Sequence, residues 1–93
     1  MLSKIPIDLE KIKTEDIDKE IIRSAIIAEL DAINLYEEMA ALAKDKGIKK
    51  VLLDVAKEEK EHVGEFHTLL LMFDKEQVKE LEEGKEEVEE LMK

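Results

Sequence analysis

Three residues have the types and the spacing to bind a metal ion: Glu29, Glu59 and His62. Because residues three apart on a helix point the same way, Glu59 and His62 can offer a carboxylate oxygen and an imidazole nitrogen to one ion. The chain contains one such Glu-x-x-His pair. A di-iron carboxylate bundle uses two of these pairs, together with a Glu from each of two further helices. The sequence therefore encodes half of such a site, and it predicts that two copies of the chain meet to build the whole.

The same side chains admit a second interpretation. An unpaired carboxylate buried in an apolar seam costs several kcal/mol, so Glu29 and Glu59 should be paired, neutral or bound to metal. Metal coordination is the first interpretation, and a buried hydrogen-bonded Glu-His pair that sets the register of a helical dimer is the second. Oxygen-rich sites with one imidazole per ion suit iron or manganese, although zinc accepts such ligands. In a two-fold pair, Glu59 of each copy would bridge two ions about 3.5 to 4 Å apart.

Two long amphipathic helices, over residues 14–46 and 47–73, are predicted to position the three residues. Each has an apolar stripe at spacings of three and four. Glu29 is the only charge in the first stripe, and Glu59 and His62 interrupt the second at the same depth. The stripes are Ile22, Ala25, Ile26, Glu29, Ala32, Ile33, Tyr36, Met39, Ala40 and Ala43, then Leu52, Val55, Ala56, Glu59, His62, Val63, Phe66, Leu69, Leu70 and Phe73.

The connection between these helices is short, which predicts an antiparallel hairpin. Lys46 and Gly47 would supply a basic end and a left-handed stop to the first helix. If Lys46 marks the bend, residues whose numbers sum to about 92 lie level, so Glu29 faces Val63, next to His62. We therefore expect an all-α fold: a helical hairpin, or half-ferritin, that becomes a four-helix bundle on dimerisation.

The two ends of the chain complete this single domain of residues 1–93. Residues 1–13 are expected to form an arm that packs on the body or on a neighbour, and Thr14 can cap the first helix. Asp74 and Gln77 resemble a capping box that opens short C-terminal helical segments over 74–93. Gly84 is expected to break them, which leaves a last short turn of helix.

Other residues near the candidate site have weaker signals. Tyr36 is about 10.5 Å along the helix from Glu29, so we expect its hydroxyl to approach the site only from the partner copy. Asp31 could guide cations to the site, although an ordinary solvated acid is the simpler expectation. His67 is read as a surface or interface residue. Gly64, inside a helix, suggests a close approach of another helix.

Composition excludes several function classes. With 15 Lys and Arg against 25 Asp and Glu, the formal charge is −10, which repels phosphate backbones and attracts cations. Nucleic acid is therefore not an expected partner. The absence of Cys excludes thiolate zinc sites and iron-sulfur clusters. No apolar run reaches the roughly 20 residues that span a bilayer, so we expect a soluble, intracellular chain and no membrane.

Two segments make the chain resemble a known family. Residues 26–37, IIAELDAINLYE, and 54–66, DVAKEEKEHVGEF, are similar to those of the encapsulated ferritins, and most closely to archaeal members. These are half-length relatives of ferritin carried as cargo inside encapsulin nanocompartments. The resemblance implies that Glu29, Glu59 and His62 are iron ligands, with Tyr36 close to the metals. It also implies a cytoplasmic protein held inside an encapsulin shell.

The resemblance further implies a ferroxidase site at the interface of two subunits, with dimers assembling into a ring, commonly a decamer. Asp31 matches one of the acids that guide iron in the family, and Ala28 replaces another. No C-terminal docking peptide and no fused shell protein is recognised in the sequence, so we expect either an excised domain or a chain that docks to a shell through another feature.

The expected function is therefore a ferroxidase that oxidises Fe(II) with dioxygen and supplies iron for storage by the surrounding shell. Two ferrous ions side by side can each give one electron to the same oxygen molecule. Two alternatives stay open: a non-catalytic helical oligomer with a buried Glu-His register element, and a rubrerythrin-like peroxide reductase.

Overall fold

Three helices make up the part of the chain that the structure, a computed structural model, describes, which is residues 16–93. They are α1 (Ile17–Leu42), α2 (Lys46–Phe73) and α3 (Lys75–Leu91). No strand occurs among these residues, so the prediction of an all-α fold is confirmed. The expected arm over 1–13 and the Thr14 cap lie outside the described residues.

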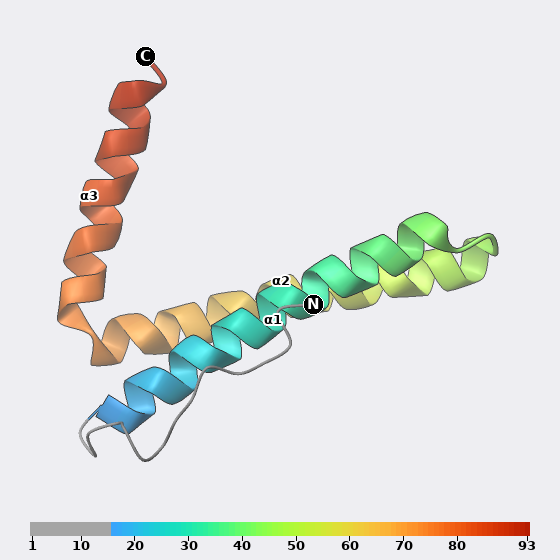
Figure 1. Ribbon diagram of the computed structural model, residues 1–93, viewed down its shortest axis with the longest axis horizontal. Coiled ribbons are helices and arrows are strands. Elements are labelled where there is room, and N and C mark those ends of the chain that lie inside the picture. Colours follow the sequence, from blue (N-terminus) through green and yellow to red (C-terminus); the bar gives the residue numbers. More distant parts are fainter. Residues whose placement is uncertain (1–15) are drawn as a thin grey trace.

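Helices α1 and α2 lie side by side as the predicted antiparallel hairpin (Figure 1). Their contact is built from the apolar stripes, and it buries few side chains completely. The buried apolar residues of the described chain are Ile22, Ile33 and Ala40 on α1 and Ala56 and Leu70 on α2. Two helices packed side by side share only one interface. Much of each apolar stripe therefore stays in contact with solvent.

The bend between α1 and α2 differs from the prediction. Helix α1 ends at Leu42, four residues before the expected position, and α2 already begins at Lys46. The reason is a cap: Oδ2 of Asp45 accepts a hydrogen bond from the N–H of Ile48 at 2.9 Å, which stabilises the first turn of α2. Gly47 lies in that turn and does not adopt a left-handed conformation. A Cβ at this position would come within 3.1 Å of the same Asp45 oxygen, so Gly47 makes room for the cap.

Asp74 forms the joint between α2 and α3. Its Oδ1 accepts a hydrogen bond from the N–H of Gln77 at 3.1 Å, which confirms the predicted start of the third helix. Its Oδ2 accepts a hydrogen bond from Nη2 of Arg23 on α1 at 2.7 Å. The Gln77 N–H, and after it Arg23 and Lys19, hold the pKa of Asp74 below its ordinary value, against the opposing effect of burial. The joint thereby ties the start of α3 to both hairpin helices.

Helix α3 is continuous, so the prediction that Gly84 breaks it is wrong. The helix runs through Gly84 to Leu91, and Val88 belongs to it rather than to a separate turn. One Gly in a helix interior costs about 1 kcal/mol relative to Ala, which the surrounding Glu, Lys and Leu residues, all good helix formers, can offset. In Figure 1, α3 points away from the hairpin at a steep angle.

The single chain is more extended than a globular protein of its length. Its radius of gyration is 16.6 Å, whereas about 12 Å is expected for 93 residues folded into a sphere-like domain. Many large apolar side chains are exposed, among them Leu42, Ile48, Val51, Met72, Phe73, Val88 and Leu91. None of the described helices is long and apolar enough to cross a membrane. These exposed surfaces favour assembly with other chains.

Candidate metal centre

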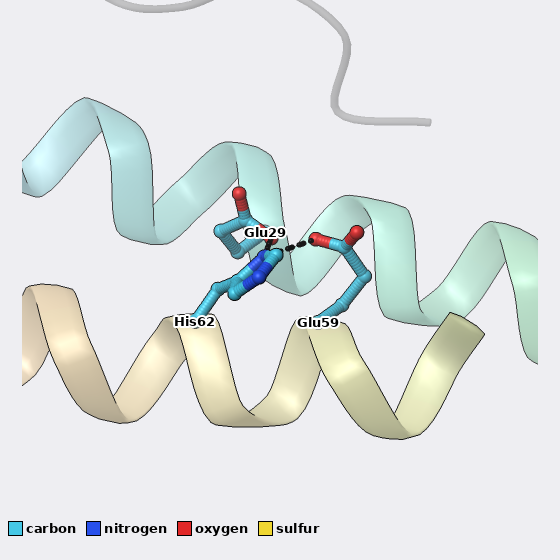
Figure 2. Close-up of side chains that lie close together, drawn as sticks. All are labelled: Glu29, Glu59 and His62. Atoms are coloured by element: carbon cyan, nitrogen blue, oxygen red, sulfur yellow. Dashed lines mark hydrogen bonds and ion pairs between the residues drawn. The ribbon is translucent and has the colours of Figure 1, made fainter. Parts of the chain in front are cut away.

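Glu29, Glu59 and His62 meet between the two hairpin helices, as the sequence predicted. Glu29 extends from the middle of α1, and Glu59 and His62 extend from neighbouring turns of α2 toward it (Figure 2). One possible ligand atom from each residue lies within 4.8 Å of the others. Nδ1 of His62 is 3.4 Å from Oε2 of Glu29 and 3.4 Å from Oε2 of Glu59. The register of the two antiparallel helices thus brings two carboxylates and one imidazole close together.

One carboxylate oxygen of this group is buried and has lost its hydrogen bonds to water without gaining one from the described part of the chain. Oε2 of Glu29 is buried and has no hydrogen bond within the described part of the chain. The side chains of Glu59 and Glu29 are only 18% and 21% exposed, whereas that of His62 is 44% exposed. Leaving a buried acceptor unsatisfied costs about 1–3 kcal/mol, and more for a charged group. A cation at this point would offset that cost.

His62 cannot satisfy both carboxylates by hydrogen bonding. Its Nδ1 carries either one hydrogen or one lone pair, so it can donate to one acceptor at most. The two distances of 3.4 Å also exceed the range of about 2.7–3.2 Å for good N–H···O bonds. The one hydrogen bond within this group joins Nδ1 of His62 to Oε2 of Glu59 at 3.4 Å, and Oε2 of Glu29 is left without one.

The same distances suit a shared metal ion. Ligand atoms about 2.1 Å from an ion are about 3.0 Å apart along the edge of an octahedron and about 3.4 Å apart in a tetrahedron. Two carboxylate oxygens and one imidazole nitrogen form a donor set that suits iron or manganese better than a soft metal. The residues present thus fit one ion per chain, with coordination positions left for further ligands.

The hairpin is open on the side where His62 is exposed. On the other side, Nζ of Lys60 on α2 binds Oε2 of Glu37 on α1 at 3.0 Å and bridges the two helices. By helical periodicity, small and apolar residues flank His62 on the open side. We call this surface the open flank; it consists of Ile21, Ala25, Ala28, Ala32 and Met39 on α1 and Val51, Val55, Leu69 and Phe73 on α2.

The other residues that the sequence singled out lie apart from the three ligands. Tyr36 is half-buried on α1, two helical turns from Glu29, and its approach from a partner copy stays a prediction. His67 is exposed, as predicted for a surface residue. A Cβ on Gly64 would meet no atom within 4 Å, so the chain itself supplies no close helix there.

The sequence-based prediction for the solvent exposure of Asp31 was wrong. We expected a solvated acid, but Asp31 is only 5% exposed. It lies with the buried Ser24 on the face of α1 turned away from α2, so α1 is buried on two faces rather than one. The apolar periodicity of α1 did not indicate this burial, because it assigns polar residues outside the apolar stripe to the solvent-exposed face. A role of Asp31 in guiding cations stays a prediction.

Two ion pairs between distant parts of the chain had no signal in the sequence. Arg23, the only arginine of the chain, binds Asp74, and Lys60 binds Glu37. Each joins residues more than 20 positions apart, and each became recognisable only when the bend fixed the register of the hairpin.

Comparisons with known proteins agree with this architecture. Residues 20–93 match the Rubrerythrin family. A ferritin-like-encapsulin shell fusion protein from Pyrococcus furiosus is 59% identical over 93 residues, which cover 98% of this chain and 27% of the relative. The crystal structure of an encapsulated ferritin domain from Pyrococcus furiosus matches with a TM-score of 0.83 and 58% identity, over 98% of this chain and 95% of that one. The chain thus spans about a quarter of the fusion protein and nearly all of the solved domain.

Proposed function

The chain belongs to the rubrerythrin family, among the encapsulated ferritins, and we propose that it is a ferroxidase whose di-iron site is shared by two copies. The observation that carries the proposal is the buried Oε2 of Glu29, which has no hydrogen bond in the described chain and faces Glu59 and His62. These three residues bind Fe(II) as the substrate.

Dimerisation completes the site. Each chain supplies one Glu and one Glu-x-x-His pair, whereas di-iron carboxylate bundles use two of each. A second copy that packs on the open flank brings its own three ligands to the exposed side of His62. Glu29 and His62 are then terminal ligands, and Glu59 of each copy bridges two ions about 3.5 to 4 Å apart.

The open flank has the surface that such a contact needs. Its α1 side carries small side chains, Ala25, Ala28 and Ala32, which let another helix approach closely. Its α2 side exposes Val51, Leu69 and Phe73. Covering these apolar side chains stabilises the dimer by about 25 cal/mol per Å² removed from water, and the four helices then enclose one core.

The electron balance explains why two irons are needed. Each Fe(II) gives up one electron, and together they reduce one O₂, which takes up two protons, to hydrogen peroxide; the products are two Fe(III). The carboxylates favour the more highly charged Fe(III) and so stabilise the product side. A half-bundle encloses no storage cavity, so the Fe(III) leaves the site.

Tyr36 contributes from the partner copy. A two-fold axis near the level of Glu59 places Tyr36 of one chain near the level of Glu29 of the other, where its hydroxyl can donate a hydrogen bond close to the ions. In its own chain it is about 10.5 Å along α1 from Glu29, which is too far for this.

The partners follow from the same family membership. A relative described as a ferritin-like-encapsulin shell fusion protein supports an encapsulin shell as the partner. We place the chain in the cytoplasm, inside such a nanocompartment, where the shell stores the iron that the dimers oxidise. Dimers assemble further into a ring, such as a decamer.

A second candidate, peroxide reduction, draws support from the match to the Rubrerythrin family. The same two irons would then pass two electrons to one hydrogen peroxide, which takes up two protons and forms two water molecules. The rates of Fe(II) oxidation with O₂ and with peroxide, measured at equal concentration, separate the two functions: the ferroxidase proposal requires the O₂ reaction to be faster.

The direct test is oxygen consumption after Fe(II) is added to the protein, with Glu59→Gln compared with Glu58→Gln. Glu58 is the exposed neighbour of Glu59, so the two variants remove the same charge one position apart. We expect Glu59→Gln alone to abolish protein-dependent consumption. Equal loss or equal retention in both variants would refute the assigned site.

A further inference from the structure

Met39 is the sulfur-containing side chain of the open flank. The described residues include three methionines, Met39, Met72 and Met92, and the sequence contains no cysteine. Met72 and Met92 are 71% and 81% exposed, whereas Met39 is half-buried on α1. Peroxide oxidises a methionine thioether to the sulfoxide. The open flank thus carries one readily oxidised atom, the sulfur of Met39.

The proposed ferroxidase reaction makes an oxidant at this flank. One O₂ that receives one electron from each of two Fe(II) leaves as one hydrogen peroxide in every turnover. Because the second copy covers the open flank, the peroxide forms between the two chains and not in bulk water. A group a few Å away therefore meets it at an effective concentration far above that in solution.

The partner copy brings its Met39 to the site. Within one chain Met39 follows Glu29 by ten residues, which is about 15 Å along α1 and too far to reach the ions. A two-fold axis near the level of Glu59, which is also the level of residue 33, places Met39 of one chain level with residue 27 of the other. This level is only about 3 Å along the helix from that of Glu29.

The direction of the side chain and the surface that it meets favour this approach. Helical side chains tilt toward the N-terminus of their helix, and in the antiparallel partner this direction leads from Met39 toward the ions. Ala25 and Ala28 of the open flank lie on either side of the level of residue 27. Methionine is unbranched and fills irregular gaps, so it fits over these two methyl groups.

We propose that Met39 of the partner copy reduces the hydrogen peroxide formed at the ions and becomes methionine sulfoxide, an inference that rests on the proposed ferroxidase function. The O–O bond breaks, one oxygen binds the sulfur, and the other leaves with both protons as water. The sulfur loses the two electrons that the peroxide gains, so no further reductant is needed. A dimer holds two such sulfurs and disposes of the peroxide from two turnovers before a reductase must restore them.

Mass spectrometry of the methionine-containing peptides tests the proposal in a single turnover. The full chain is loaded without oxygen with two Fe(II) for every two chains, mixed with O₂ while oxygen consumption is recorded, and quenched with EDTA. We expect sulfoxide at up to one Met39 in two, because one turnover makes one peroxide per dimer. Met72 and Met92 should contain about tenfold less. Catalase in the buffer should leave the yield at Met39 unchanged.

Peroxide added from outside should give the opposite order. In iron-free protein with EDTA it attacks from bulk water, so the more exposed Met72 and Met92 should be oxidised before Met39. The Glu59→Gln variant, mixed with Fe(II) and O₂, should leave Met39 unoxidised because no peroxide forms at the site. These two controls separate a sulfur next to the ions from one that is merely reactive.

Removal and displacement of the sulfur give a second readout, the ratio of free peroxide to O₂ consumed, which does not depend on the rate. Met39→Leu conserves the size of the side chain and should raise this ratio to about one from the first turnover. Met72→Leu is the matched control and should leave the ratio at the wild-type value. Met39→Leu combined with Leu42→Met moves the sulfur to a position that is 81% exposed, where catalase should protect it.

Three results would overturn the proposal. One is oxygen consumption with no more sulfoxide at Met39 than at Met72, and another is loss of the Met39 sulfoxide when catalase is present. The third is a Met39→Leu variant that releases no more peroxide per O₂ than the wild type. A sample that consumes no oxygen would instead refute the ferroxidase function, and this inference with it.

Discussion

The Glu29→Gln variant should be more stable than the wild type without metal and less stable than the wild type with metal bound. Glutamine keeps the shape of the side chain and removes the charge from the buried Oε2, which has no hydrogen bond in the described chain and lies near a second carboxylate. Relief of that charge is worth about 1 kcal/mol, the lower end of the range for an unsatisfied buried group, because Glu29 is still 21% exposed. In EDTA, the variant should therefore melt about 4–8 °C above the wild type.

Bound metal should have the opposite effect. An ion at 100 times its dissociation constant stabilises the wild type by about 2.7 kcal/mol, and a 100-fold loss of affinity reduces this to about 0.4 kcal/mol. With Mn(II) as a probe that does not react with oxygen under these conditions, the wild type should be the more stable by about 1.3 kcal/mol.

The assay is thermal unfolding followed by circular dichroism at one chain concentration, with EDTA or Mn(II). Glu58→Gln serves as the control, since Glu58 is exposed and outside the ligand group. A Glu29→Gln variant that is less stable than the wild type in EDTA and does not respond differently to Mn(II) would refute the reasoning. Glu29 would then be a structural partner of His62.

Three further predictions concern the site and the joint. Glu59→Ala and His62→Ala should each lower Fe(II)-dependent oxygen consumption by about 100-fold or more, measured with an oxygen electrode; near wild-type rates in either would exclude that ligand. Tyr36→Phe should slow oxidation and leave the iron stoichiometry unchanged in stopped-flow and titration experiments, whereas an unchanged rate would place Tyr36 away from the ions. The pKa of Asp74 is lowered in the folded chain, chiefly by the Gln77 N–H. The stability that Asp74 contributes is therefore complete at a pH above its ordinary pKa of 3.8, and it is lost as the pH falls through the lowered pKa. Asp74→Asn keeps an N-cap without a titrating group, so it should remove this loss from the helix signal below pH 4; the same acid transition in both proteins would contradict it.

The sequence predicted the hairpin and the meeting of its ligands well, for a physical reason. Two long apolar stripes joined by a short bend can pack in one way only, and the level of each residue then follows from helix rise. Glu29 and His62 therefore met close to the predicted level, although the bend itself was placed differently. A shift of two or three residues in the ends of the helices changes the level by less than one turn.

The predictions that were wrong depend on interactions that the apolar periodicity of a helix does not reveal. The position of the bend depends on the Asp45 carboxylate, whose cap starts α2 before Gly47. Asp31 is buried on a face of α1 that its periodicity assigned to solvent. The continuity of α3 through Gly84 reflects the summed helix propensity of its neighbours rather than the glycine alone.

The direction of α3 could not be predicted for a related reason. It is fixed by Asp74, which receives hydrogen bonds from Gln77 within α3 and from Arg23, 51 residues away on α1. Pairings over such a distance depend on the tertiary structure, whereas the capping of Gln77 by Asp74 is local and was predicted from spacing.

Native mass spectrometry during an anaerobic titration with Fe(II) tests the central claim most directly, because it counts chains and irons in the same ion. The shared site predicts assemblies with two irons for every two chains, and none in the Glu59→Ala variant. Iron bound to single chains, or equal iron uptake by wild type and Glu59→Ala, would contradict a di-iron site built from two half-sites.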